Sequence, residues 1–237
     1  SITPMTIWKY SEVGHSQDAK QNLKKLFDGK SFFDYPKSVE LIKRCIQLYS
    51  NESSIIIDFF SGSATTAHAV MQLNAEDGGK RKFIMVQLPE KTDEKSEAFK
   101  AGYKNICEIG KERIRRAGEK IKEEAGLNGQ DLDIGFRVLK LDSSNMKDIY
   151  YSADEYDQGM LENMQSNTKE DRTDLDLLFG CLVDWGLELD KPYTIKEING
   201  HKVHIYNDGD LVACFEKDLD MKTIDEIAKL QALRVVF

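Results

Sequence analysis

The chain has 237 residues, of which 41% are hydrophobic, so it can build one large or two modest domains, and global disorder is excluded. Its 33 Lys and Arg against 41 Asp and Glu give a formal net charge of −8. That sign excludes a domain that grips DNA through its overall field, because phosphate binding needs clustered cations. If the chain acts on DNA, we expect another segment or subunit to supply most of the contact.

Cysteine usage and hydropathy narrow the setting further. The four cysteines are widely spaced and form no C-x-x-C pair, which disfavours a disulfide framework or a zinc site. No stretch approaches the roughly 20 apolar residues that cross a bilayer, and no signal peptide is visible. We therefore expect a soluble, cytoplasmic protein with no membrane contact and no metal site. The chain starts without Met and finishes on the strand-like run 233–237, so we expect a piece of a longer polypeptide.

The first 50 residues predict two helices. One is expected near Asp18–Phe27. Pro36 bars a helix upstream of it, whereas Ser38 can cap one that starts there. The apolar residues that follow, up to Tyr49, recur at helical spacing.

Residues 54–88 predict a βαβ unit. Ser54–Phe60 is mostly apolar, as in a central parallel strand that is buried on both faces. A small-residue loop follows, then a helix over Thr66–Leu73 and a second strand over Lys82–Leu88. Such a unit is right-handed and belongs to a parallel sheet.

A single long helix is predicted from Ser96 to Ala125, with a stripe of small and apolar residues spaced by three and four. The remaining face is rich in Lys and Arg, and we interpret it as solvated rather than as a DNA contact. The residues assigned to that face are Lys111, Arg113, Arg115, Arg116, Lys120 and Lys122.

A domain boundary is predicted near residue 130, so that 1–130 and 131–237 form separate domains. The second is expected to be a small α+β module, opening with a strand over Gly135–Leu141 and an Asp-rich polar stretch up to residue 171. Thr173 is positioned to cap a helix, and Asn199-Gly200 is a strong hairpin signal within a three-stranded meander. A last helix is expected over Thr223–Gln231.

The loop after the first strand is the best candidate for a ligand site. It reads Asp58-Phe59-Phe60-Ser61-Gly62-Ser63-Ala64-Thr65-Thr66. In open α/β sheets, ligands bind where strands end and helices begin, and a helix start favours an anion by about 0.3–1 kcal/mol. Asp58 could meet an ammonium group, so an amino-acid ligand would find partners for both its charges.

Two familiar phosphate motifs are excluded for this loop. No Gly-Lys-Ser/Thr follows, as a P-loop requires, and only Gly62 stands where a dinucleotide fingerprint needs three glycines. The residues alone leave two interpretations open: a site for a small zwitterionic or anionic ligand, and an ordinary βα turn. His68, one turn into the helix, has no apparent acidic partner and is interpreted as a packed side chain rather than an acid–base catalyst.

The same run resembles a known family. Asp58–Val70 is similar to the S-adenosylmethionine motif of amino-methylating DNA methyltransferases, which typically reads D-x-F-x-G-S-G-T-T. The continuation to Glu90 resembles the modification subunit of type III restriction–modification systems, as do Gly14–Gln17 and Phe33–Ser38. The resemblance implies an α/β fold: a partial Rossmann-like methyltransferase sheet, followed by the small C-terminal module. It also implies S-adenosylmethionine as cofactor.

The resemblance carries a set of cofactor-binding residues. Those expected to contact the cofactor are Phe33, Lys37, Ser38, Asp58, Phe59, Phe60, Ser61, Gly62, Ser63, Thr65, Gln87 and Glu90. Lys37 is expected near the methionine end. Gln87 stands where many relatives carry an acidic ribose ligand, so either Gln87 or Glu90 could take that role. Ala64 replaces a usual Gly, which predicts that its backbone needs no positive φ.

The catalytic Asp-Pro-Pro-Tyr tetrapeptide of the family is not among these residues, because none of the four prolines is adjacent to another. We assign no catalytic residue and expect the chain to be inactive alone. The resemblance implies a circularly permuted adenine-N6 methyltransferase that acts on DNA through its other half. It further implies a restriction subunit as partner and a homodimer, with 131–237 as the expected region of dimerisation or subunit contact.

Two rival hypotheses remain open from the sequence. The chain could be a non-catalytic assembly module of such a subunit, or an unrelated nucleotide-binding protein, which the missing glycines disfavour.

Overall fold

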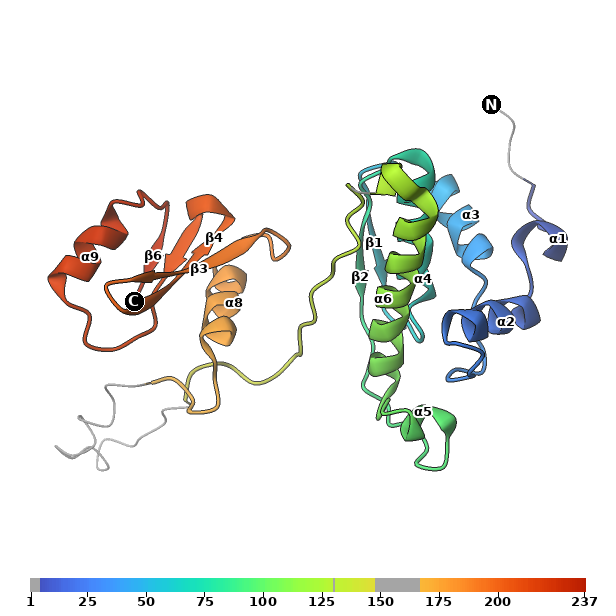
Figure 1. Ribbon diagram of the computed structural model, residues 1–237, viewed down its shortest axis with the longest axis horizontal. Helices are drawn as coiled ribbons and strands as arrows, with labels where there is room; N and C mark the ends of the chain where they lie inside the picture. Colours follow the sequence, from blue (N-terminus) through green and yellow to red (C-terminus); the bar gives the residue numbers. More distant parts are fainter. Residues whose placement is uncertain (1–4, 130, 148–166) are drawn as a thin grey trace. The chain divides into compact units, whose positions relative to one another are not determined.

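The computed structural model describes residues 5–129, 131–147 and 167–237. The chain forms two compact units, one up to Phe136 and one from Arg137 onward (Figure 1). The Asp-rich stretch predicted within the second module lies largely outside the described residues.

The first unit is mixed α/β and contains the predicted βαβ motif. Strands β1 and β2 are parallel, with Ile55 opposite Lys82 and Asp58 opposite Met85, and helix α4 connects them. The helices and strands of this unit are α1 (Tyr10–Val13), α2 (Ser16–Leu26), α3 (Val39–Tyr49), β1 (Ile55–Asp58), α4 (Thr65–Asp77), β2 (Lys82–Met85), α5 (Glu97–Lys100), α6 (Ile106–Ala125) and the 3-10 turn η1 (Gly126–Gly129). Both helices predicted before residue 50 are present.

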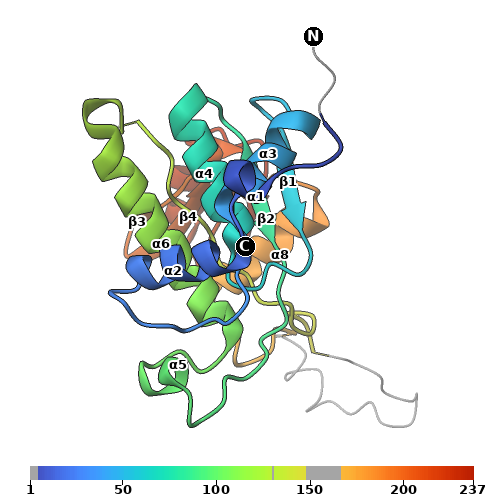
Figure 2. The same ribbon diagram turned by 90° about the vertical axis from the view of Figure 1, so that its right-hand side faces the viewer.

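Helices α3, α4 and α6 cover one face of this two-stranded sheet. Ile56 and Phe83 pack against α3 and α4, while Met85 joins the cluster formed by α4 and α6. Figure 2 shows α4 and α6 running side by side. The opposite face is open in the described part of the chain: Ile55 is 58% and Ile57 is 51% exposed. The prediction that the first strand is buried on both faces is therefore wrong.

The long helix predicted from 96 to 125 is wrong in its first third. The chain turns at Gly102, whose φ is 96°, a backbone conformation that glycine adopts at little cost. Helix α6 begins only at Ile106, where Asn105 caps it by accepting the Glu108 amide. The Ile106 amide also donates to the Glu90 carbonyl, which ties the start of α6 to the segment after β2.

The first unit extends to residue 136 because the segment after η1 packs back along α6. Leu132, Ile134 and Phe136 join the core of α4 and α6, and Ile134 lies directly against Gly118. The strand predicted over Gly135–Leu141 is wrong, since these residues form no ladder. Phe136, near the start of this segment, packs against the core of α4 and α6 and pairs with no strand.

The second unit contains the predicted meander and adds a strand to it. The sheet order is β3-β4-β5-β6, with the first three strands antiparallel and β6 parallel to β5. Its elements are α8 (Asp174–Asp184), β3 (Tyr193–Ile198), β4 (His201–Tyr206), the 3-10 turn η3 (Asn207–Gly209), β5 (Leu211–Ala213), α9 (Met221–Ala228) and β6 (Val235–Val236). The hairpin turns at Asn199-Gly200, where both φ angles are positive.

One helix covers each face of this sheet. Leu178 and Leu182 of α8 pack with Tyr206 on one side, and Ile227 of α9 packs with Val203 on the other. Thr173 caps α8 as predicted, in a reciprocal capping box with Asp176.

Candidate functional site

Asp58 ends β1 and braces the loop that follows. Its Oδ1 accepts the Phe60 amide at 3.2 Å, and its Oδ2 accepts the Thr66 hydroxyl at 2.6 Å. One carboxylate thus connects the strand end, the loop and the first turn of α4. Phe59 and Phe60 are both exposed beside it.

Ala64 adopts a conformation that its residue type does not predict. Its φ is 59° and its ψ is 42°, in the left-handed region, where a non-glycine residue costs about 1–2 kcal/mol. The expectation that this position needs no positive φ is therefore wrong. Ala64 is also the N-cap of α4 and offers no side-chain acceptor, so the first amides of a 13-residue helix have no side-chain cap.

Helix α6 lies close to this loop at Gly110. A Cβ atom there would lie 3.4 Å from the Gly62 carbonyl oxygen and 3.5 Å from the Ala64 Cβ. The loop is therefore held between the end of the sheet and the body of α6, in keeping with the burial of Ala64.

Arg113 is the residue of this site that the sequence interpretation placed wrongly. It is 2% exposed rather than solvated, and its guanidinium donates to the Ser63 hydroxyl at 2.9 Å and the Thr65 hydroxyl at 2.7 Å. Helical spacing carried a signal for this: Arg113 is three residues after Gly110 and four before Ala117, both buried. The side chains of Ser63 and Thr65, expected to face a ligand, are turned toward Arg113.

Three segments that the sequence singled out converge at this end of the sheet. The Gly62 amide donates to the Gln87 Oε1 at 2.7 Å, and Ser61 donates its amide to the Val86 carbonyl. The Phe33 ring lies against Gly62, and its Cζ is 3.4 Å from the point that a Cβ on residue 62 would occupy. Gln87 also donates to the Leu88 carbonyl, so both polar ends of its side chain are engaged within the chain.

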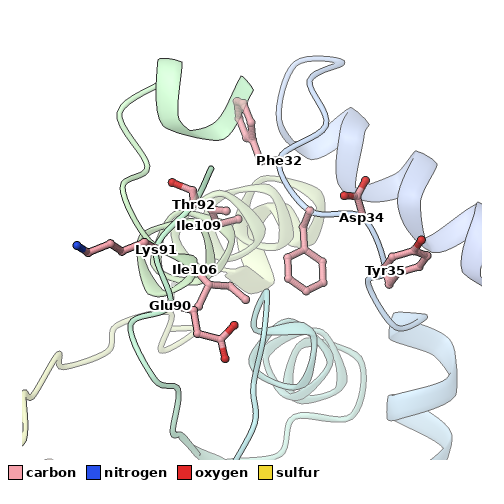
Figure 3. Close-up of a pocket in the computed structure, with 9 residues that line it drawn as sticks. Phe32, Asp34, Tyr35, Glu90, Lys91, Thr92, Ile106 and Ile109 are labelled. Atoms are coloured by element: carbon pink, nitrogen blue, oxygen red, sulfur yellow. The ribbon is translucent and has the colours of Figure 1, made fainter. Parts of the chain in front are cut away.

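A pocket of about 270 Å³ opens beside Phe33 (Figure 3). Its apolar walls come from the start of α6 and from the segment before α3. Its polar groups come from the segment after β2 and from Asp34 and Tyr35 before α3. The lining residues are Phe32, Phe33, Asp34, Tyr35, Glu90, Lys91, Thr92, Ile106 and Ile109. Figure 3 shows the Lys91 side chain directed away from the other lining residues. Phe33 and Glu90 are therefore brought to one cavity.

Of the twelve expected cofactor residues, only Phe33 and Glu90 line that pocket, and Lys37 and Ser38 lie outside both the pocket and the loop. Ser38 caps α3 by accepting the Leu41 amide and lies close to Gly14. Lys37 precedes it and is exposed. Both residues lie between Phe33 and the start of α3.

His68 is held as a neutral imidazole behind the loop. Burial, and secondarily the positive charge of Arg113, lower the pKa of His68 to about 3. Its Nδ1 is enclosed and has no hydrogen-bond partner in the described residues. A histidine that stays neutral at physiological pH and has no acidic partner is a packed side chain, in keeping with the sequence interpretation.

The described residues hold no group of three or more His, Cys, Asp or Glu side chains arranged for a metal ion. None of the helices in the same part of the chain is both long enough and apolar enough to cross a bilayer.

Comparison with known proteins gives one consistent result. The chain matches the DNA methylase family over residues 2–123, slightly more than half its length. It is 41% identical over 128 residues to the StyLTI Mod subunit of a type III restriction-modification enzyme from Salmonella typhimurium, which covers 54% of this chain and 19% of that protein. It is 38% identical to the EcoPI Mod subunit of Escherichia phage P1, over 57% of this chain and 20% of that protein.

A third relative covers more of the chain. The EcoP15I Mod subunit of Escherichia coli is 32% identical over 200 residues, which is 83% of this chain and 29% of that protein. The chain therefore spans between about a fifth and three tenths of the length of these relatives.

Proposed function

The chain belongs to the DNA methylase family, and on that premise we propose that it is the S-adenosylmethionine-binding portion of a DNA adenine-N6 methyltransferase of the type III modification kind. The observation that carries the proposal is the position of Phe33. Its ring lies against Gly62 of the loop and also lines the pocket that holds Glu90. Three sequence segments with separate resemblance to the family thus share one site at the carboxyl ends of β1 and β2.

The loop suits the amino-acid half of the cofactor. The uncapped amides at the start of α4 favour a carboxylate, and the partial positive charge of a helix start adds to that preference. Asp58 supplies a negative charge a few residues away for the ammonium group. This is the pairing expected for a zwitterion, and an ordinary βα turn does not require it.

The pocket suits the nucleoside half. Its apolar walls and the Phe33 ring offer a surface for a base. Its volume is just below the roughly 300–1,000 Å³ of whole-ligand sites, as expected for a pocket that takes part of a ligand. Between the two candidate ribose ligands we assign Glu90. Gln87 is already bonded to Gly62 and Leu88, whereas Glu90 lines the pocket.

The bound cofactor would supply an activated methyl group; what this chain supplies is the orientation of that cofactor. Holding a flipped adenine requires the Asp-Pro-Pro-Tyr tetrapeptide, which these 237 residues do not contain. We therefore propose that the intact protein contacts DNA and a restriction subunit, that the region 131–237 serves dimerisation or subunit contact, and that this chain alone does not methylate DNA. Methyl transfer to duplex DNA by the purified chain would contradict the last point.

The test is a calorimetric titration of the purified chain with S-adenosylmethionine. Asp58→Asn is the sharpest variant, because an amide can still accept from Phe60 and bond to Thr66 while the charge is lost. We expect Asp58→Asn and Glu90→Gln each to weaken binding roughly 10- to 100-fold, the range of a hydrogen bond to a charged group. Glu94→Gln, at an exposed acid outside the pocket, is the matched control and should bind as the wild type does.

Loss of binding in both site variants and retention in the control would support the proposal. A well-folded wild type that binds no cofactor would contradict it for this chain. The interpretation of the chain as an assembly module would then take its place, and light scattering would test that interpretation through the oligomeric state.

A further inference from the structure

Arg113 is a buried cation whose partners in the described residues include no carboxylate. Its guanidinium donates to the Ser63 carbonyl and hydroxyl and to the Thr65 hydroxyl, and its Nε has no partner. The neighbouring arginines of α6 behave differently, since Arg115 and Arg116 both pair with Glu112. Burying an arginine in this way is unfavourable unless something offsets it, because buried charges are normally paired.

The contacts of Arg113 are concentrated on one short piece of backbone. Ser63 and Thr65 flank Ala64, which is the residue in the left-handed conformation. One planar guanidinium therefore fixes the residues on both sides of a strained position, and its rigid fork of donors suits that task better than a flexible ammonium. Helix α6 also lies against the same loop at Gly110.

The charge itself survives burial. Burial lowers the pKa of Arg113 only to about 10, so the side chain remains a cation at neutral pH. A fixed positive charge thus lies beneath the loop and the N-terminus of α4, where it adds to the field that attracts an anion from the other side.

We propose that Arg113 is a positioning residue: it holds the Ser63–Thr65 backbone and the start of α4 in the arrangement that receives the carboxylate of the cofactor's methionine half. The inference rests on the proposed function of the same loop. Arg113 acts through Ser63 and Thr65, whose hydroxyls occupy it, and does not touch the ligand. Because its hydrogen bonds in the described residues go to Ser63 and Thr65, we expect its effect at the carboxylate end of the ligand rather than at Glu90.

The experiment compares two ligands that differ only in that carboxylate, S-adenosylmethionine and decarboxylated S-adenosylmethionine, by calorimetry on the full chain. Arg113→Gln should weaken S-adenosylmethionine roughly 10- to 100-fold, as loss of a residue that orients a ligand group commonly does, and leave the decarboxylated ligand within about twofold. Arg113→Lys should recover part of the loss. Arg115→Gln, on the exposed face of α6, should change neither affinity.

A double-mutant cycle tests whether Arg113 acts through Ser63. Ser63→Ala should lower S-adenosylmethionine affinity, and combining it with Arg113→Gln should give less than the sum of the two losses, because the residues act as one unit. If Arg113→Gln fails to fold, Arg113→Lys and Ser63→Ala carry the same comparison of ligands.

The outcomes separate the two claims. Equal weakening of both ligands, or unchanged affinity for S-adenosylmethionine, overturns the role of Arg113 while leaving the proposed function standing. A wild type that binds neither ligand overturns the proposed function and this inference together.

Discussion

Replacing His68 tests whether the space behind the loop is as closed as its contacts indicate. The folded pKa of His68 is about 3 against an ordinary value of 6.5, so the unfolded chain takes up a proton that the folded chain refuses. The free energy of unfolding therefore rises with pH between these two values. The contribution of the neutral His68 is fully present above pH 6.5 and is lost progressively as the pH falls toward 3. His68→Gln removes this titration.

The size of the effect follows from linkage. At pH 5 the unfolded imidazole is almost fully protonated while the folded one remains neutral, so His68 lowers the free energy of unfolding by about 2 kcal/mol relative to pH 7.5. The acidic groups with lowered pKa values, such as Asp77 and Asp176, titrate below their ordinary 3.8 and do not interfere in this window. The variant should lose this slope between pH 7.5 and 5, whatever its stability at pH 7.5.

The assay is urea unfolding at several pH values in a Trp185→Phe background, so that Trp8 reports on the first unit. Trp8 lies beneath Arg44 of α3, which packs on α4. Gln47→Ala, at an exposed position of α3, is the control, because it changes no titratable group and should leave the slope unchanged. Identical pH slopes for wild type and His68→Gln would refute the reasoning and mean that His68 is hydrated.

Further predictions concern packing and capping, and urea unfolding followed by circular dichroism checks each of them. Gly118→Ala gains about 1 kcal/mol of helix propensity but places a Cβ 2.9 Å from that of Ile134, and the overpacking of about 1–3 kcal/mol should win, giving net destabilisation. Gly110→Ala meets nothing closer than 3.4 Å and should be at least as stable as the wild type; the reverse order of the two variants would contradict the packing of 131–136 on α6. Thr173→Ala removes the hydroxyl half of the capping box with Asp176 and should destabilise the second unit by about 1 kcal/mol, whereas an unchanged midpoint would show that α8 needs no cap.

The elements that the sequence predicts well are those governed by neighbouring residues. Asn199-Gly200 specifies a hairpin because both residues tolerate positive φ, and the hairpin is present. Ser38 and Thr173 begin helices because their hydroxyls accept an amide three residues on, in α3 and α8 alike. Such signals act over a few residues and survive in any tertiary context.

The failures concern interactions between distant segments. An apolar run such as Ile55–Ile57 is typical of a doubly buried strand, yet burial depends on which helices cover the sheet, and α3, α4 and α6 all lie on one face. The alternation in Gly135–Leu141 is equally compatible with a segment that packs on a helix. In that segment Phe136 ends beneath the guanidinium of Arg115 and pairs with no strand.

The candidate site also combines features that the sequence predicts with features that it does not. The loop can be recognised from its own residues, but its backbone geometry depends on Arg113 of α6, about 50 residues later. The substitution of Ala for the usual Gly at position 64 suggests a relaxed backbone, whereas the guanidinium of Arg113 holds the strained one through Ser63 and Thr65. A strained residue that is held from both sides is expected where a backbone must be presented to a ligand. A turn that only connects a strand to a helix has no need of a conformation that costs free energy. That contrast is why we favour a binding site over an ordinary βα turn, a choice that the residues of the loop alone leave open.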